Sequence, residues 1–570
     1  MKVIIVGGVA GGASAAARLR RLDEQAEIIM FERSGFVSYA NCGLPYYIGG
    51  SITEEEALTL QTPESFRRRF QIDVRVRHEV MEIHAAEKNV TVKNLETGET
   101  FTESYDKLIL SPGARPTVPN IIGTDCDRVF TLRTVEDTLS IKRFVEENDV
   151  KSVVIAGGGF IGLEMAENLR ELGLDVTLIQ RPKQVLAPLD EDMAVMLHRT
   201  LRAHGIKLRL GASVEGFTQE ENRVTTLLKD EESVQSDMVL LAIGVTPDTK
   251  LAKDAGLELG QKGSIVVNDR METSDPNIYA VGDAVEVYHY VTGHKTLISL
   301  AGPANKQGRI AADNICGGDS RYKGSQGSSV LKLFDLTAAA TGINEKTAKM
   351  EGIPYDKIIL SPLNHAGYYP GGKNMVMKVL FNKEDNRLLG AQIVGYEGVD
   401  KRIDVLATAI HCNMKATELA ELDLAYAPPY SSAKDPVNMA GFMIENIVTG
   451  KMKQFHWHDV ESLPRDGSVQ LVDSRTPFEY ARGCAEGFVN IPVDEMRERI
   501  SELDINKPVY IMCQSGLRSY IACRLLMNMG YDCYNFSGGY GYYASVMEDR
   551  RLAEEAYPCG MEKEFNIQNI

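Results

Sequence analysis

The chain opens with a pattern of apolar, small and basic residues that predicts a strand, a tight turn, a helix and a second strand. An apolar run from Lys2 to Val6 precedes the glycine-rich stretch 7–12, and apolar and basic positions then recur at helical spacing from Ala13 to Leu22. A second apolar run, Ile28 to Phe31, ends at the acidic Glu32. In such a unit, glycines let the backbone approach a pyrophosphate at the helix N-terminus, and the acidic residue accepts the ribose hydroxyls.

The first glycine turn departs from the usual pattern, because Val9 replaces its middle glycine. A single glycine-rich turn also fits a purely structural turn. If the turn holds a dinucleotide, the expected contacts are Gly7, Gly8, Ala10, Gly11, Glu32 and Arg33.

A second copy of the pattern strengthens the nucleotide interpretation. Residues 151–156 predict a strand, 163–172 a helix and 175–179 another strand, and the turn keeps all three glycines, Gly157, Gly159 and Gly162. Two units in tandem imply two nucleotides, so that one can supply electrons to the other. The second unit ends in Gln180 and Arg181 rather than in an acidic residue. Arg181 either accepts a 2′-phosphate or faces solvent, which leaves NADH and NADPH both open.

A strand-rich region follows from Leu331 to about Gly450. It contains alternating stretches at 375–381 and 389–395 and turns helical at 403–412. A domain boundary is expected at 449–460, where a new α/β pattern begins.

Composition places the chain among ordinary globular proteins. Its residues are 44% hydrophobic and 25% charged. A length of 570 residues is enough for about three or four domains with buried cores. A formal net charge of −17 argues against nucleic acid or an anionic membrane as the main partner. No apolar run is long enough to span a bilayer, and glycines interrupt the N-terminal run that resembles a signal peptide. Nine dispersed cysteines fit a reducing cytoplasm, which is the expected location.

Two cysteines stand in distinctive stretches. Cys42, in the stretch 38–46, follows the first dinucleotide unit and has no second cysteine nearby. A lone cysteine must pair with a partner outside the chain, as a mixed disulfide or persulfide, or be oxidised to a sulfenate, so a small thiol is the expected partner. The loop 513–519 is of the kind that holds sulfur on a thiolate, with Cys513 as the nucleophile and Arg518 adding charge or positioning. Two sulfur sites in one chain indicate a relay.

A third segment, 273–283, matches the flavin signature of two-dinucleotide disulfide reductases, with Gly282 at the flavin and Asp283 bonding its ribityl chain. With these motifs in order, residues 1–450 resemble the coenzyme A-disulfide and CoA-persulfide reductases of the pyridine nucleotide-disulfide oxidoreductase family. The stretch around Cys42 is the most specific match. The resemblance implies FAD and NAD(P)H as cofactors, with Cys42 against the flavin and receiving CoA as a mixed disulfide.

The resemblance also implies the other contacts of this site. Arginines suit a ligand that carries phosphate groups, as CoA does. The implied CoA contacts are Ser14, Arg18, Arg21, Ser38, Asn41, Asn305 and Lys434. In a homodimer, Tyr368 and Tyr426 match segments that reach the neighbouring subunit's active site, where a phenol can donate a hydrogen bond to a leaving thiolate. The alternative is that both tyrosines only pack in the interface.

The C-terminal pattern resembles rhodanese, with strands at 469–473 and 509–512. Asp473, Arg475 and Glu479 match the structural framework of that family. An inactive binding module is the alternative to a sulfurtransferase. Among the other cysteines, Cys523 and Cys533 are expected in the core rather than in a disulfide with Cys513. No role is assigned to Cys559 or to Cys484, which replaces the usual histidine.

The predicted fold class is α/β: a tandem FAD- and NAD(P)-binding flavoprotein with an α+β dimerisation domain and a rhodanese domain. The expected boundaries are 1–112 and 246–325 for FAD binding, 113–245 for NAD(P) binding, 326–450 for dimerisation, 451–459 for a linker and 460–560 for rhodanese. No metal site is expected.

The expected activity is NAD(P)H- and FAD-dependent reduction of CoA disulfide or CoA persulfide through Cys42, coupled to sulfane-sulfur transfer at Cys513. One alternative is an NADH oxidase or peroxidase that cycles a Cys42 sulfenate. It is disfavoured because the peroxidase type has a histidine where this chain has Ala10, and because Cys42 is followed by the stretch 43–46. The other is a redox sensor or sulfur carrier without turnover.

Overall fold

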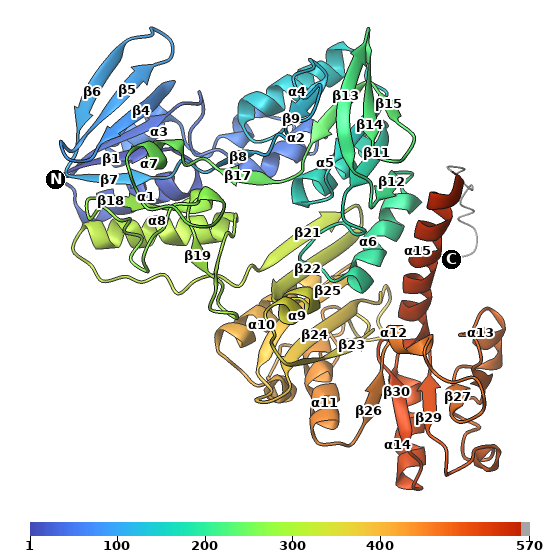
Figure 1. Cartoon of the computed structure of the whole chain (residues 1–570). Helices are drawn as coiled ribbons and strands as arrows, with labels where there is room; N and C mark the ends of the chain where they lie inside the picture. Colours follow the sequence, from blue (N-terminus) through green and yellow to red (C-terminus); the bar gives the residue numbers. More distant parts are fainter. Residues whose placement is uncertain (560–570) are drawn as a thin grey trace. The chain divides into compact units, whose positions relative to one another are not determined.

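The computed structural model describes residues 1–559, with the side chains of 554–559 left out, so Cys559 lies outside the described side chains. The chain forms two compact units (Figure 1). The first joins Met1–Lys183 to His204–Gly327, and the second joins Gln184–Ala203 to the chain from Ser328 onward. The segment 184–203 therefore groups with the C-terminal half and not with its sequence neighbours. No helix within the described range is long and apolar enough to cross a membrane.

The N-terminal sheet of the first unit is parallel and has the strand order β18-β7-β1-β2-β3. Its strands are β1 (Lys2–Val6), β2 (Glu27–Glu32), β3 (Asp73–Val76), β7 (Lys107–Leu110) and β18 (Ile278–Ala280). Val3, Ile4 and Ile5 of the central strand are completely buried, as expected for a parallel sheet covered on both faces. Because β18 joins this sheet far downstream of β7, the chain returns to its first domain after building the second.

Helices α1 (Ala10–Leu22) and α8 (Ala301–Ile315) pack closely on each other. A Cβ atom on Gly308 would lie 2.3 Å from the backbone oxygen of Gly11, so only glycine permits this approach. The sequence predicted that the first helix begins at Ala13, and that was wrong by one turn. The last residues of the glycine turn already adopt helical geometry, and apolar spacing does not report on them.

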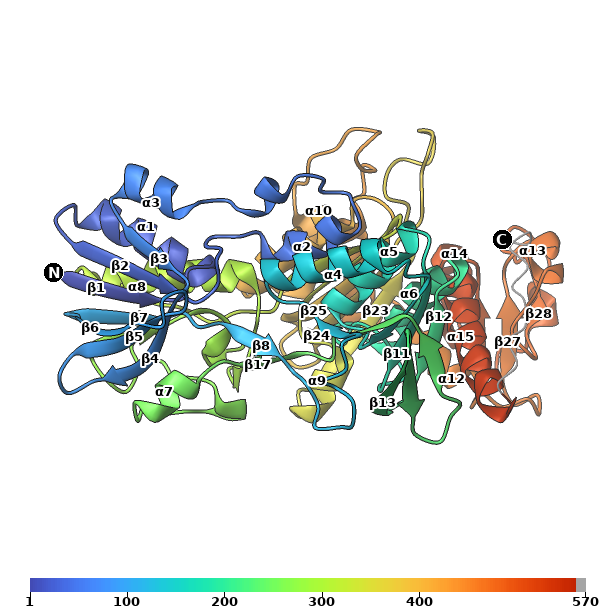
Figure 2. The same cartoon turned by 90° about the horizontal axis from the view of Figure 1, so that it is seen from above.

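The second sheet of this unit repeats the first, in the parallel order β12-β11-β10-β16-β9. Its strands are β9 (Val129–Thr131), β10 (Ser152–Ala156), β11 (Asp175–Gln180), β12 (Lys207–Leu210) and β16 (Met238–Leu241). Helix α5 (Phe160–Glu171) follows the glycine turn and again begins one turn before the predicted start at Leu163. In Figure 2, the short helix α2 (Leu44–Ile48) lies beside α5 and α4 (Val135–Glu147), and α2 contacts both.

The remaining secondary structure of this unit lies outside the two parallel sheets. Two antiparallel sheets of three strands each consist of β4 (His78–His84), β5 (Asn89–Asn94) and β6 (Thr100–Ser104), and of β13 (Val214–Glu220), β14 (Arg223–Leu228) and β15 (Val234–Ser236). Two ribbons pair β8 (Ala114–Pro116) with β17 (Val245–Pro247), and β19 (Val287–Tyr288) with β20 (Lys295–Thr296). The short helices are α3 (Pro63–Phe70) and α7 (Lys250–Asp254).

The second unit contains an antiparallel sheet in the order β21-β22-β25-β24-β23. Its strands are β21 (Ser329–Leu333), β22 (Leu336–Gly342), β23 (Tyr355–Leu360), β24 (Val376–Asn382) and β25 (Leu388–Gly395). Helix α10 (Val399–His411) covers β22 and β25 and lies beside α11 (Pro436–Val448). Helices α6 (Glu191–Ala203) and α9 (Glu345–Met350) complete this part.

The C-terminal domain of the second unit is built on a parallel sheet in the order β26-β30-β29-β27-β28. Its strands are β26 (Lys453–Phe455), β27 (Gln470–Asp473), β28 (Val489–Asn490), β29 (Val509–Met512) and β30 (Cys533–Phe536). Its helices are α12 (Trp457–Val460), α13 (Pro477–Ala481), α14 (Leu517–Asn528) and α15 (Gly539–Cys559).

This domain is bonded to the edge of the antiparallel sheet within the same unit. The backbone N–H of Ile359, on the edge strand β23, donates to Ser537 Oγ at 2.9 Å, and Ser361 Oγ donates to the backbone oxygen of Gly538 at 3.0 Å. Gln454 Nε2 donates to the backbone oxygen of Lys357 at 2.7 Å. The bonds of Ile359 and Lys357 occupy backbone groups that an edge strand would otherwise leave open.

A buried charge cluster lies beside this junction. The ammonium group of Lys378, which is completely buried, lies 2.9 Å from Asp190 and 2.8 Å from Asp192 and also pairs with Glu345. Lys357 pairs with Glu345 at 2.8 Å. Burial alone would raise the pKa of Glu345, but the two lysines hold it well below its ordinary value. The three carboxylates could together hold a metal ion, but here they surround lysine ammonium groups instead.

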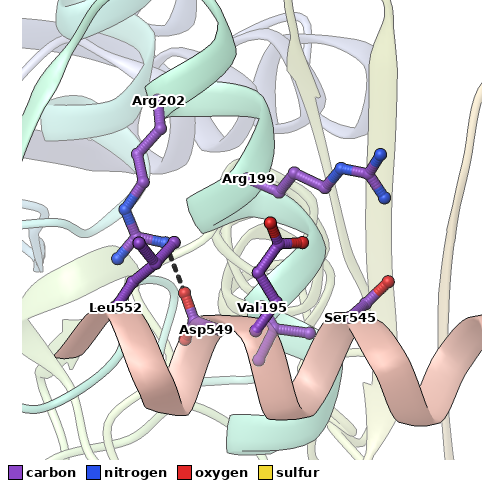
Figure 3. Close-up of a pocket in the computed structure, with 7 residues that line it drawn as sticks. Val195, Arg199, Arg202, Ser545, Asp549 and Leu552 are labelled. Atoms are coloured by element: carbon purple, nitrogen blue, oxygen red, sulfur yellow. Dashed lines mark hydrogen bonds and ion pairs between the residues drawn. The ribbon is translucent and has the colours of Figure 1, made fainter. Parts of the chain in front are cut away.

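Helices α6 and α15 form a second contact inside the unit. Figure 3 shows the small pocket between them, where Arg202 from α6 pairs with Asp549 from α15 at 2.5 Å. The other oxygen of Asp549 bonds His198 Nδ1 at 2.9 Å, and His198 Nε2 accepts a hydrogen bond from the backbone N–H of Val185. Because Nε2 is an acceptor, Nδ1 carries the proton that His198 donates to Asp549.

Candidate functional site

The first glycine turn shapes a helix N-terminus. Gly7 has a φ of +92°, and a Cβ atom on it would lie 2.1 Å from the backbone oxygen of Ser111. The N-cap of α1 is Val9, at a φ of −97° that any residue adopts, and no side chain caps the helix. The replacement of the middle glycine is therefore tolerated. The uncapped turn suits an anionic group such as a pyrophosphate.

The carboxylate of Glu32 is hydrogen-bonded to the backbone of this turn. One of its carboxylate oxygens accepts a hydrogen bond from the N–H of Gly8 at 2.8 Å, and the other accepts one from Ser34 at 2.9 Å. Burial raises the pKa of Glu32, and the two backbone bonds oppose that rise. Arg33, the next residue, pairs with Asp248 at 2.8 Å.

The second glycine turn repeats this design with an amide. Gly157, at a φ of +115°, lies so close to Ala242 that a Cβ atom would come within 2.2 Å of its backbone oxygen. Gln180 Oε1 accepts a hydrogen bond from Gly158 N–H at 2.9 Å, in the manner of Glu32 in the first unit. A Cβ atom on Gly159 would meet nothing within 4 Å, so the space above this N-cap is open to a ligand.

The remaining predicted nucleotide contacts lie around these two turns. A Cβ atom on Gly162 would come within 1.9 Å of Gly157, which explains the third glycine of the second turn. Arg181 follows β11 and is exposed. Gly282 has a φ of +85°, and its N–H donates to Gln307 at 2.7 Å. Asp283 pairs with Arg133 at 2.7 Å.

Cys42 lies in a 3₁₀ turn, Asn41–Gly43, directly before α2. The residue is exposed, yet the protein around it desolvates the sulfur, and together with the carboxylate of Glu164 this raises the pKa of the Cys42 thiol. Ser38 precedes it with a φ of 49°, a left-handed backbone that is unusual for serine and is typical of strained functional loops.

Asn41 ties the Cys42 turn to Arg133. In the orientation that satisfies both of its polar atoms, the Asn41 amide donates to the backbone oxygen of Arg133 at 2.9 Å and accepts from its guanidinium at 3.3 Å. Asp283 holds the same guanidinium. The turn that carries Cys42 is thereby linked to the predicted flavin residue Asp283.

Helices α1 and α8 bring several predicted CoA contacts together. Ser14 Oγ donates to Asn305 at 2.5 Å, and Arg18 pairs with Asp313 at 2.6 Å. Arg21 is exposed. The neighbouring Arg20 is different, because its guanidinium donates to five backbone oxygens and serves the fold.

In the second unit, the two predicted tyrosines lie against each other. The hydroxyl oxygens of Tyr368 and Tyr426 are 2.5 Å apart, and the side chains are 75% and 46% exposed. The hydrogen bond to Tyr368 raises the pKa of Tyr426. Lys434 is also exposed, in the loop that follows Tyr426.

Arg402, which the sequence analysis missed, joins the loops that carry these tyrosines. It is completely buried in α10, pairs with Asp435 at 2.9 Å and donates to the backbone oxygens of Asn364 and Tyr430. The sequence shows only that an arginine lies on the apolar face of a helix. It does not show which residue pairs with that arginine.

The Cys513 loop surrounds its sulfur with donors. Cys513 follows β29 directly and is completely buried. The N–H of Gly516, at a φ of +94°, donates to the sulfur at 3.1 Å, and the hydroxyl of Ser519 donates to it at 3.2 Å. The sequence analysis assigned no role to Ser519, which lies in the first turn of α14.

Arg518 does not contribute an unpaired charge to this loop. Both of its terminal nitrogens bond the carboxylate of Glu479 at 2.7 Å, and this pairing lowers the pKa of Glu479 to about 2. The framework residue Arg475 is buried, pairs with Asp473 at 2.7 Å and stacks on Tyr540 with a distance of 3.8 Å to the ring centroid.

The other cysteines are free thiols in the described part of the chain. Cys523 and Cys533 are completely buried in the apolar core of the C-terminal domain, where burial raises their pKa, in the case of Cys533 to about 12. They belong to the core, as expected, and not to a disulfide with Cys513. Cys484 is exposed and hydrogen-bonds to Tyr480.

Comparisons with known proteins agree with this architecture. Residues 1–308 match the family of pyridine nucleotide-disulphide oxidoreductases, 328–436 match its dimerisation domain, and 456–545 match the rhodanese-like domain. Coenzyme A disulfide reductase of Staphylococcus haemolyticus is 39% identical over 447 residues, which are 78% of this chain and all of that protein.

Two solved structures extend the similarity through the C-terminal domain. The reduced CoADR-RHD of Bacillus anthracis has a TM-score of 0.94 and 49% identity, covering 96% of this chain and 98% of that one. The NAD-dependent persulfide reductase of A. fulgidus has a TM-score of 0.89 and 36% identity, covering 95% of this chain and all of that one.

The chain belongs to the pyridine nucleotide-disulphide oxidoreductase family and carries a rhodanese-like domain behind the reductase. It is an FAD- and NAD(P)H-dependent oxidoreductase. The family, the fold class and the two cofactors predicted from the motifs are confirmed. The uncapped helix at the first turn and the open space at Gly159 fit the two nucleotides.

Proposed function

We propose that the protein reduces CoA disulfide and CoA persulfide with NAD(P)H, using Cys42 as its redox-active thiol, and that Cys513 delivers sulfane sulfur to CoA. The observation that carries the proposal is that a chain with two dinucleotide turns holds an exposed cysteine, Cys42, and a second cysteine, Cys513, whose sulfur accepts two hydrogen bonds. The related CoA disulfide reductase and persulfide reductase support the substrate class.

Bound FAD would accept hydride from NAD(P)H and pass two electrons to sulfur. The chain's own part begins when the Cys42 thiolate attacks a sulfur of CoA disulfide, which forms the mixed disulfide and releases one CoA thiol. Two electrons then break that bond and return the thiolate with a second CoA thiol. With CoA persulfide as substrate, the products are CoA thiol and hydrosulfide.

The same proposal gives Cys513 a transfer reaction without net redox change. A persulfide on Cys513 is attacked at its outer sulfur by the CoA thiolate, which yields CoA persulfide and leaves the Cys513 thiolate. The N–H of Gly516 and the hydroxyl of Ser519 stabilise that thiolate as the leaving group. Arg518, held by Glu479, keeps the positioning role predicted for it.

Several predicted contacts enter the proposal with defined positions. Glu32 and Asp283, with the turn residues Gly7 to Gly11, hold FAD, and Ser14, Arg18 and Asn305 lie together on α1 and α8 as CoA contacts. In a homodimer, Tyr368 and Tyr426 complete the partner's Cys42 site, and their exposure supports this role.

Gln180 and Arg181 bear on the choice of nicotinamide. A glutamine in the place of an acidic residue removes the charge that repels a 2′-phosphate, and the exposed Arg181 can pair with one. We therefore propose that the enzyme accepts NADPH as well as NADH.

Steady-state oxidation of NADH and of NADPH, followed with CoA disulfide, CoA persulfide and glutathione disulfide, tests this function. We expect turnover with both CoA substrates and both nicotinamides, and at least about tenfold lower kcat/KM with glutathione disulfide, which lacks the CoA phosphates. Equal kcat/KM with glutathione would contradict the assignment of CoA. Oxygen-dependent consumption without any sulfur substrate, at the same rate, would favour the oxidase alternative.

A further inference from the structure

Two loops of the second unit present Tyr368 and Tyr426 at exposed positions. The first loop is buried at residues 364–366 and exposed throughout 367–374, so Tyr368 belongs to its exposed part. The second loop is exposed at Tyr426 and becomes buried at Ser431. The two hydroxyl oxygens nevertheless lie 2.5 Å apart. The position of the two hydroxyls therefore depends on what holds the buried residues of both loops.

Arg402 of α10 is hydrogen-bonded to both loops. Its Nη2 atom donates to the backbone oxygen of Asn364 at 3.0 Å and to that of Tyr430 at 3.2 Å. Each of these residues is four positions from a tyrosine of the pair. The Arg402 side chain is buried, and Gly398 leaves room for it, because a Cβ atom on Gly398 would lie 2.1 Å from Nη1. One buried guanidinium therefore holds the bases of both loops.

Asp435 and Ser431 complete the anchor of the two loops. The carboxylate of Asp435 pairs with Arg402 at 2.9 Å and accepts a hydrogen bond from Ser431 Oγ at 2.6 Å. It also caps α11, because it accepts from the N–H of Val437 at 3.0 Å. The backbone oxygen of Ser431 accepts a hydrogen bond from the N–H of Ala366 at 3.0 Å, which joins the loops directly. The buried charge is thus paired at the point where the loops meet.

Two charged neighbours of this anchor bond one loop each. Lys401 lies 3.8 Å from Asp435 and donates to the backbone oxygen of Ala425 in the second loop at 3.4 Å. Glu397 accepts a hydrogen bond from Asn364 Nδ2 in the first loop at 3.3 Å. Among these three charged side chains, only that of Arg402 bonds both loops in the described part of the chain.

We infer that Arg402 is a positioning residue of the reductase site, which sets the Tyr368–Tyr426 pair before substrate arrives by holding the bases of both loops. The inference rests on the proposed role of the two tyrosines. When Cys42 forms the mixed disulfide, the S–S bond of CoA disulfide breaks and the leaving CoA thiolate takes a proton from one phenol. The second phenol donates a hydrogen bond to the phenolate, and solvent returns the proton. The pair serves this step only while its hydroxyls are held together.

The first measurement reports on the tyrosine pair without turnover. Photo-oxidation joins neighbouring tyrosines as dityrosine, and the cross-link between the peptides of Tyr368 and Tyr426 is quantified by mass spectrometry in FAD-loaded protein. Arg402→Lys keeps the charge but not the planar fork that bonds several oxygens, so we expect the yield to fall at least about fivefold. Tyr368→Phe should give no such cross-link. Arg387→Lys is the matched control, because Arg387 of the same unit is exposed, and its yield should equal that of the wild type.

A second variant covers the case in which Arg402→Lys does not fold. Arg402→Met combined with Asp435→Asn removes both buried charges, and asparagine can still cap α11. FAD content and size-exclusion chromatography establish that each variant is folded. The double variant should lose the cross-link to the same extent, because it also lacks the guanidinium.

The second measurement separates positioning from general damage. In the mixed disulfide of CoA with thionitrobenzoate, the aromatic thiolate has a low pKa and leaves without the help of a proton donor. Arg402→Lys should lower kcat with CoA disulfide by at least about tenfold and keep kcat with the mixed disulfide near that of the wild type. Tyr426→Phe should show the same selective loss.

An unchanged cross-link yield in folded Arg402 variants overturns the inference. Equal losses with both disulfides in Arg402→Lys, alongside a selective loss in Tyr426→Phe, overturn it as well, because a general loss of structure acts on both substrates. If Tyr426→Phe shows no selective loss, the proton-donor role in the proposed function fails instead. A reduced cross-link yield then still supports Arg402 as the residue that sets the pair.

Discussion

Cys42 and Cys513 stand in opposite surroundings. Cys42 is exposed in a short turn. Desolvation of its sulfur by the surrounding protein and the negative charge of Glu164 both disfavour its thiolate. Cys513 is completely buried, and two donors point at its sulfur. Two donors at the sulfur suit a cysteine that persists as a thiolate or as a persulfide between reactions. An exposed thiol that ionises reluctantly suits a sulfur that should react only when its substrate covers it.

The two sites also differ in how complete they are. The donors of Cys513 and the Glu479–Arg518 pair come from one small domain. The residues predicted to act with Cys42 belong to both units. Among them, Tyr368 and Tyr426 lie on exposed loops whose backbone oxygens accept hydrogen bonds from Arg402. In the proposed dimer, the reductase site therefore depends on assembly, whereas the sulfurtransferase site does not. The following experiments test that contrast.

The largest effect is expected for Cys42→Ser. Serine cannot form the mixed disulfide, so turnover with CoA disulfide and CoA persulfide should fall by at least about a thousandfold. The flavin absorbance and the thiosulfate sulfurtransfer of Cys513 should stay at wild-type levels, because neither uses Cys42. Reductase activity near that of the wild type would remove Cys42 from the mechanism.

Cys513→Ala should give the complementary result. Sulfur transfer from thiosulfate to CoA should be lost, while reduction of presynthesised CoA persulfide continues at close to the wild-type rate. Cys484→Ala serves as the control, since Cys484 is an exposed thiol of the same domain outside the loop. If direct CoA persulfide reduction collapses in folded, flavin-loaded Cys513→Ala, Cys513 takes part in the reductive step and the division between the sites is wrong.

Mixing inactive subunits tests whether the Cys42 site is shared. Tyr426→Phe is expected to impair turnover by itself, because it removes the phenol proposed to protonate the leaving thiolate. After subunit exchange with Cys42→Ser, half of the dimers are mixed and each holds one competent site, so about a quarter of the wild-type activity should return. Confirmed heterodimers with no activity beyond that of the parents would show that the tyrosine does not act across the interface.

The features that could be predicted are those that depend on a few consecutive residues. The two dinucleotide turns, Cys42 and the Cys513 loop each occupy only a few consecutive residues, and local spacing carries their chemistry. Glycine turns followed by apolar helices identified the two strand–turn–helix–strand units. The helix starts were missed by a turn because the last residues of each glycine turn, 10–12 and 160–162, already belong to the helix.

The missed features depend on contacts between distant segments. Arg402 and Lys378 are buried charged residues, and sequence spacing does not reveal that Asp435 or Asp192 lies beside them. The grouping of 184–203 with the second unit has the same origin. The catalytic and ligand-binding roles of the predicted residues stay predictions, as do the domain boundaries.

The smallest effect is expected for Ser519, and it tests whether the cradle around Cys513 acts on the sulfur. Ser519→Ala removes a hydroxyl that lies 3.2 Å from the sulfur and leaves the Gly516 N–H in place. A hydrogen bond to a charged group contributes about 1.5–3 kcal/mol, so sulfurtransfer should fall by about tenfold to a hundredfold and not be abolished. Ser519→Thr keeps the hydroxyl and should recover most of the sulfurtransfer rate. If Ser519→Ala leaves the rate unchanged, the hydroxyl serves only its alternative acceptor, the backbone oxygen of Gly516, and the backbone alone forms the cradle.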